Sequence, residues 1–77
     1  MYSNEVENSD LRKARASIAE ELDAVSWYEK RIESVKDAKL KKILAHNRDE
    51  EKEHAAMLIE WMRKTDKKQD EAFKKHD

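Results

Sequence analysis

The spacing of apolar residues constrains this chain most, because stripe positions recur every three or four residues along two long stretches. The first stripe is formed by Leu11, Ala14, Ile18, Glu21, Val25, Tyr28, Ile32 and Val35. The second stripe is formed by Leu40, Leu44, Asn47, Glu51, His54, Leu58 and Trp61. This alternation is the period of a helix with one buried face. Glycine and proline, which tight turns between strands normally need, are both absent. The sequence therefore predicts an all-α fold.

The helix boundaries follow from the capping residues. Ser9 or Asp10 is a candidate N-cap for a first helix that runs to about Val35, and Asp37 can cap a second helix of similar length. Residues 1–8 are polar and are expected to be frayed. The second helix is expected to fade near Thr65 and Asp66, and residues 66–77 are expected either to extend it or to be disordered. Residues 1–77 are predicted to form a single domain.

Two helices with a short connection form an antiparallel hairpin. A chain of 77 residues buries only a small core, and without cysteine it has no disulfide to support that core. A bound metal or association with further copies can give the missing support. We expect at least a dimer, in which two hairpins form a four-helix bundle.

Charge excludes several classes of partner. Charged residues make up 45% of the chain, yet both signs are interleaved and the net charge is −1. Binding to nucleic acid or to an anionic membrane surface favours a basic face, so neither is expected. No apolar run is long enough to span a bilayer, and the first residues do not resemble a signal peptide. A cytoplasmic protein is expected.

Ionisable residues occupy the middle of both apolar stripes. Glu21 lies in the first, and Glu51 and His54 lie one turn apart in the second. A lone ionised carboxylate in an apolar core costs several kcal/mol, so this placement needs compensation. A metal ion supplies it, and carboxylates with an imidazole suit iron, manganese or zinc. In an antiparallel hairpin the two mid-helix groups meet at the same height.

The number of ligands favours a site shared by two chains. Di-iron carboxylate bundles take a Glu from each of two helices and a Glu-x-x-His from each of the other two. This chain supplies half of that set, and two copies supply all of it. Two alternatives remain: a metal-free helical oligomerisation module whose polar stripe residues set the register, and a manganese enzyme with the same ligands.

The segments EELDAVSWYEKR and KKILAHNRDEEKEHAAMLIEWMRK resemble the encapsulated ferritins, which are housed inside encapsulin nanocompartments. The likeness extends from about Ile18 to Arg63. It implies a ferritin-like hairpin that assembles into a ring of ten chains, arranged as five dimers, with a ferroxidase site across a dimer interface. Such a protein oxidises Fe(II) to Fe(III) with dioxygen and feeds iron storage within the encapsulin shell, its implied partner.

The resemblance also implies roles for individual residues. The implied iron ligands are Glu21, Glu51 and His54. The implied neighbours of that site are the aromatic residues Trp27 and Tyr28. Glu20 and Asp23 match an acidic pair that holds a second metal on the path of iron inward, either iron, calcium or another divalent ion. Without the resemblance, such a pattern usually indicates a solvated acidic face.

Overall fold

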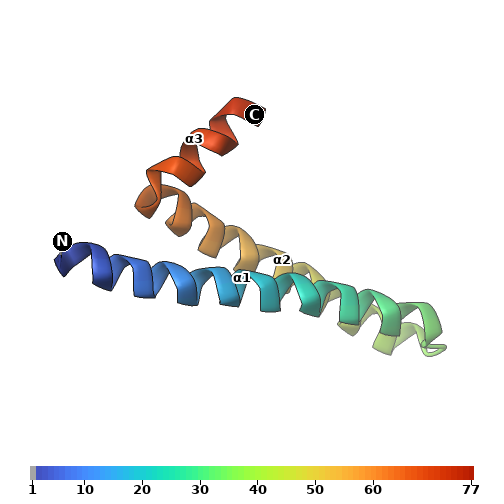
Figure 1. The fold of residues 1–77 in the computed structure, drawn as a ribbon. Helices are drawn as coiled ribbons and strands as arrows, with labels where there is room; N and C mark the ends of the chain where they lie inside the picture. Colours follow the sequence, from blue (N-terminus) through green and yellow to red (C-terminus); the bar gives the residue numbers. More distant parts are fainter. Residues whose placement is uncertain (1) are drawn as a thin grey trace.

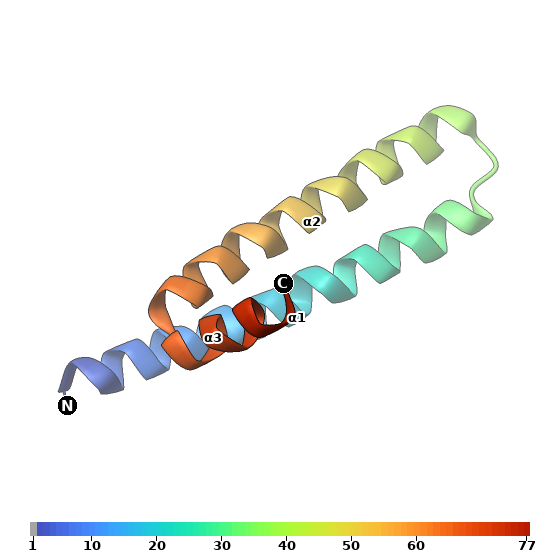
Figure 2. The same cartoon turned by 90° about the horizontal axis from the view of Figure 1, so that it is seen from above.

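Three helices make up the part of the chain that the computed structural model describes, which is residues 2–77, with side chains from residue 9 onward. The helices are α1 (Tyr2–Ser34), α2 (Ala38–Thr65) and α3 (Lys67–His76). α1 and α2 run antiparallel and side by side, whereas α3 turns away from the hairpin and packs on α2 (Figures 1 and 2). The described residues contain no strand, which confirms the all-α prediction.

The start of α1 differs from the prediction. The helix begins at Tyr2, so neither Ser9 nor Asp10 is its N-cap. A capping residue is only a preference, and no proline or glycine in the preceding segment prevents the helix from continuing through it. The N-terminal end of α1 consequently extends beyond the end of α2 (Figure 2).

The connection between α1 and α2 is short and has extended backbone. The Val35 N–H donates to the carbonyl of Arg31 at 3.0 Å, which closes the last turn of α1. The Asp37 carboxylate then accepts from the Leu40 N–H at 2.8 Å, so Asp37 is the N-cap of α2, as predicted. No described residue has positive φ, which explains how a chain without glycine makes this connection.

Asp66 separates α3 from α2, so α2 ends where the sequence predicted that the second helix fades. The tail beyond it forms a separate helix, whereas the sequence predicted either an extension of the second helix or disorder. The backbone of Asp66 is extended, with φ −109° and ψ 98°, and its N–H donates to the carbonyl of Met62 at 2.8 Å. Its carboxylate accepts from the Gln69 N–H at 3.1 Å and from Arg15 of α1 at 2.9 Å. One aspartate therefore ends α2, begins α3 and links both to α1.

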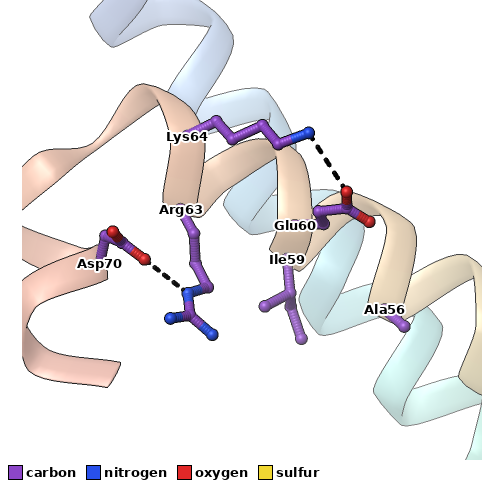
Figure 3. Close-up of a pocket in the computed structure, with 6 residues that line it drawn as sticks. All are labelled: Ala56, Ile59, Glu60, Arg63, Lys64 and Asp70. Carbon is purple, nitrogen blue, oxygen red and sulfur yellow. Dashed lines mark hydrogen bonds and ion pairs between the residues drawn. The ribbon is translucent and has the colours of Figure 1, made fainter. Parts of the chain in front are cut away.

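Arg63 holds α3 against α2. Its guanidinium donates to Asp70 at 2.7 Å, lies 3.6 Å from Asp77 and stands 4.7 Å from the centre of the Phe73 ring. The angle between the two helices leaves a groove of about 430 Å³. Figure 3 shows its lining residues, which are Ala56, Ile59, Glu60, Arg63, Lys64 and Asp70.

Both carboxylates of this groove already have cationic partners. Asp70 pairs with Arg63, and Glu60 accepts from Lys64 at 3.2 Å, as the dashed lines in Figure 3 show. A cation that entered the groove would have to displace one of these pairs. The groove is therefore a joint between two helices in which both carboxylates are already paired.

The hairpin has a thin core. Its buried apolar side chains, among those described, are Leu11, Ala14, Ala55 and Met62. The chain exposes 6356 Å², whereas a compact monomer of 9.2 kDa would expose roughly 4,900 Å². A single copy thus leaves an unusually large surface in water.

Part of that surface is one face of α2, which we call the outer stripe and define as Leu40, Ile43, His54, Met57 and Trp61. The sequence placed Leu40, His54 and Trp61 in the second stripe. In the single hairpin all three are exposed, although His54 still reaches Glu21 of α1 at 3.4 Å. The α2 residues buried toward α1 are Ala55 and Met62. The predicted stripe is wider than one neighbouring helix can cover, so its far edge remains exposed.

Within the described residues, every helix is too short or too polar to span a membrane.

Candidate metal centre

Glu21, Glu51 and His54 come together in the middle of the hairpin. Glu21 lies on α1, and the other two lie on α2, where a separation of three residues places them on one face. Each residue offers one ligand atom, and these atoms all lie within 4.8 Å of one another. The sequence predicted this grouping from the stripe positions, because antiparallel helices bring their middles to the same height.

The geometry leaves one carboxylate oxygen without a partner. His54 Nδ1 lies 3.4 Å from Glu21 Oε2 and 3.7 Å from Glu51 Oε2. Glu21 Oε2 is inaccessible to solvent and makes no hydrogen bond. Buried polar atoms are nearly always satisfied, and an exception calls for a physical explanation such as an ion. A cation between these three side chains would satisfy it.

Glu21 perturbs the pKa of Glu51. The hydrogen bond that a protonated Glu51 can make to Glu21 raises the pKa of Glu51 above its ordinary value, and loss of water and the negative charge of Glu21 act in the same direction. His54 opposes this shift. Two carboxylates this close resist ionising together, so the pair tends to retain a proton. A divalent cation can take the place of that proton.

The donor set has the composition of a transition-metal site. Two carboxylates and an imidazole suit iron, manganese or zinc, and carry enough charge for one divalent ion. The His54 side chain remains 52% exposed and belongs to the outer stripe. The site therefore opens on the face of α2 that a single copy leaves uncovered.

A second feature adjoins the site. A hollow of about 320 Å³, which we call the acidic hollow, is lined by Glu20, Asp23, Ala24, Trp27, Tyr28 and Glu51. It brings both members of the predicted acidic pair and both predicted aromatic residues next to Glu51. Glu51 thus faces His54 and Glu21 and also borders the acidic hollow.

The aromatic residues of the hollow pack on each other and on a cation. The rings of Trp27 and Tyr28 meet edge to face, with centroids 4.9 Å apart and planes at 83°. The Arg31 guanidinium carbon stands 3.7 Å from the centre of the Trp27 ring. The sequence interpretation missed Arg31 and Ala24. For Arg31 a signal existed, because an aromatic residue and an arginine four positions apart on a helix are neighbours.

The sequence matches the protein-family model described as EncFtn-like over residues 3–76. The chain belongs to the EncFtn-like family. This finding agrees with the resemblance noted from the sequence motifs. This EncFtn-like chain is 53% identical over 62 residues to an encapsulated ferritin-like protein of Rhodospirillum rubrum, an alignment that covers 80% of this chain and 44% of the relative.

Two further relatives have similar names. A ferritin-like protein of Thermotoga maritima is 51% identical over 65 residues, covering 84% of this EncFtn-like chain and 57% of the relative. An encapsulin nanocompartment cargo protein of Myxococcus xanthus is 40% identical over 58 residues, covering 75% and 45%. The chain thus spans about half the length of the curated relatives that it matches.

The fold has a solved counterpart. A crystal structure of a protein from Nitrosomonas europaea superposes with a TM-score of 0.85 at 54% identity, covering 90% of this chain and 76% of that one. Identity this high over most of the chain supports the arrangement of the helices described above.

Proposed function

We propose that this EncFtn-like chain oxidises ferrous iron with dioxygen at a di-iron centre formed by Glu21, Glu51 and His54 of two copies. The observation that supports it most directly is the buried oxygen of Glu21 that makes no hydrogen bond, beside a second carboxylate and an imidazole. The three residues form half of the ligand set that di-iron carboxylate bundles use.

The need for a second copy follows from charge and exposure. Two carboxylates balance one divalent ion, so a pair of ferrous ions needs the carboxylates of two chains. His54 lies in the outer stripe, and apolar members of that stripe need a partner to cover them. A second hairpin placed there would contribute its own Glu21, Glu51 and His54 and would close the site from water.

Each residue has a distinct task in this proposal. Glu21 and Glu51 bind the ions and neutralise their charge, and His54 adds a neutral nitrogen ligand. Glu20 and Asp23, beside Glu51 in the acidic hollow, attract cations from solvent. The reaction transfers one electron from each ferrous ion to dioxygen, and the protein holds the two ions close together so that both electrons are available.

Assembly and location belong to the same proposal. Relatives are named an encapsulated ferritin-like protein and an encapsulin nanocompartment cargo protein. We propose that dimers of this chain form a ring of ten, bound inside an encapsulin shell in the cytoplasm, and that the shell stores the ferric product.

The decisive experiment adds ferrous iron aerobically to the purified protein and follows ferric absorbance. Glu51→Ala and His54→Ala are each expected to slow the reaction by at least about tenfold. Mutating the groups that orient metal ligands already lowers activity by about this factor, and losing a ligand should lower it no less. His46→Ala is the matched control, since His46 lies on the same helix and pairs only with the exposed Glu50. Equal rates in all variants and in protein-free buffer would exclude the ferroxidase function.

A further inference from the structure

The Arg31 guanidinium packs on an aromatic ring. It lies over the face of the Trp27 ring at 3.7 Å. Within the part of the chain that the structure describes, it forms no ion pair with a carboxylate, although acidic residues are abundant. A cation centred on an indole face is attracted by the ring quadrupole. The side chain of Arg31 is thus committed to Trp27.

Trp27 is held from two sides as a result. Arg31 covers one face of its ring, and Tyr28 meets it edge to face at 4.9 Å. The indole is otherwise 49% exposed, and an exposed side chain on a helix usually exchanges between staggered rotamers. These two contacts select one orientation of the ring.

That orientation makes Trp27 a wall of the acidic hollow. The hollow has a volume of about 320 Å³ and connects Glu20 and Asp23 with Glu51. A divalent ion with six waters needs roughly 180 Å³, at about 30 Å³ per water, so it fits within this space. Because Trp27 lines the hollow, a change in the orientation of its large ring changes the space beside Glu20, Asp23 and Glu51.

We propose that Arg31 is a positioning residue that keeps the acidic hollow open for divalent cations by fixing the Trp27 ring. This inference rests on the proposed ferroxidase function, in which Glu20 and Asp23 attract cations toward Glu51. Arg31 acts through Trp27 and does not line the hollow itself.

The positive charge of Arg31 lets an experiment separate a positioning role from a purely electrostatic one. A cation near an acidic route repels incoming cations, so if charge alone mattered, its removal would make uptake easier. If Arg31 acts by fixing the ring, its removal makes uptake harder. The two effects move the iron concentration for half-maximal rate in opposite directions.

The first measurement follows the ring. In a Trp61→Phe background, Trp27 is the only tryptophan, and its fluorescence anisotropy reports its mobility. Arg31→Gln is expected to lower the anisotropy, and Arg31→Lys to restore part of it, because an ammonium keeps the attraction without the planar stacking. Arg12→Gln removes the same charge from α1 at a position roughly 22 Å from Trp27 along the helix axis. It is expected to leave the anisotropy unchanged.

The second measurement follows iron. For Arg31→Gln the half-saturating iron concentration is expected to rise several-fold at an unchanged maximal rate, with partial recovery in Arg31→Lys. A lower half-saturating concentration, or no change in both this value and the anisotropy, would overturn the positioning role.

A third measurement separates this inference from the proposed function. Cobalt(II) added without oxygen quenches Trp27 fluorescence when it enters the hollow, whether or not the protein oxidises iron. Slower quenching in Arg31→Gln than in Arg12→Gln supports the positioning role even if no ferric product forms. Equal quenching rates in these two variants refute it even if the parent is a ferroxidase.

Discussion

At the scale of single residues, the proximity of Glu21 and Glu51 lowers the stability of the metal-free fold. The pKa of Glu51 is raised above 4.5 by Glu21, so folding favours the protonated form. The stability that protonated Glu51 contributes is fully present below pH 4.5, and it is lost as the pH rises through the higher pKa of the folded state. At neutral pH the metal-free chain therefore holds two carboxylates in a position that costs stability.

Glu21→Gln tests this repulsion between carboxylates in the absence of metal. We expect the variant to melt at a higher temperature than the parent at pH 7 in the presence of a chelator, because it lacks the repelling charge. The difference should shrink toward pH 4, which lies below the raised pKa of Glu51, so that Glu51 of the parent is protonated. Thermal unfolding followed by circular dichroism across this pH range is the measurement.

Glu33→Gln is the control for Glu21→Gln, since it removes an exposed charge from the same helix and is expected to follow the parent at every pH. Parallel melting curves for all three proteins would contradict the assigned repulsion. Excess ferrous iron under nitrogen should reverse the order, so that the parent becomes more stable than Glu21→Gln.

The grouping of Glu21, Glu51 and His54 could be predicted from the sequence because helical periodicity fixes the face on which each residue lies. The packing of Arg31 on Trp27 was not foreseen. A long side chain at an exposed position can reach several neighbours, and its choice depends on rotamers that spacing does not determine.

At the scale of the helices, local signals were predictable and non-local ones were not. The cap by Asp37 involves a residue only three positions away, so the sequence indicated it directly. The Asp66 carboxylate likewise caps α3 through the Gln69 N–H three positions away, and the sequence placed the end of the second helix near Thr65 and Asp66. The packing of α3 was not foreseen, because it depends on Arg15, 51 positions from Asp66 in the sequence, and on Arg63 across the joint. Such contacts exist only once the helices have packed.

The attachment of α3 to α2 should depend on pH. Hydrogen bonds from Arg63 and Lys74 lower the pKa of Asp70 below its ordinary value of 3.8. A lowered carboxyl pKa contributes stability that is present above the ordinary value and is lost as the pH falls through the folded one. We therefore expect α3 to remain docked at neutral pH and to loosen below 3.8.

The ring resonances of Phe73, which lies beneath Arg63, report this docking by NMR. Asp70→Asn is expected to show the loosened state already at pH 7. Glu71→Gln, an exposed neighbour on the same helix, should behave as the parent does. Phe73 shifts that ignore both pH and the Asp70 substitution would show that the ion pair does not hold α3.

At the scale of the whole molecule, the outer stripe identifies the surface that most needs a partner. Helix periodicity predicted that α2 has a wide apolar face, but it could not determine which edge α1 would cover. The hairpin covers the edge with Ala55 and Met62, and leaves the edge with Met57 and Trp61 in water. The proposed second copy would bury the latter.

Met57→Glu tests this association with little risk to the hairpin, because Met57 is 68% exposed in the single chain. We expect unchanged helicity, a smaller mass in solution and a loss of iron oxidation of at least tenfold, since apolar burial of a methionine contributes about 1.5–3 kcal/mol per copy. Light scattering and ferric absorbance measure the two effects.

Glu53→Gln is the matched control for Met57→Glu, because it changes an exposed residue of the same helix without adding charge to the outer stripe. An oligomer of parental mass that contains Met57→Glu would show that copies associate through another surface.

The division of the ligand set between two helices of one copy and two of another has a genetic consequence. Under the proposed function, each working centre requires two intact copies, so a cell that makes both a normal and a ligand-deficient chain would lose more centres than the share of defective chains. Mutations at Glu51 or His54 should then behave as dominant, whereas a mutation that prevents association should be recessive.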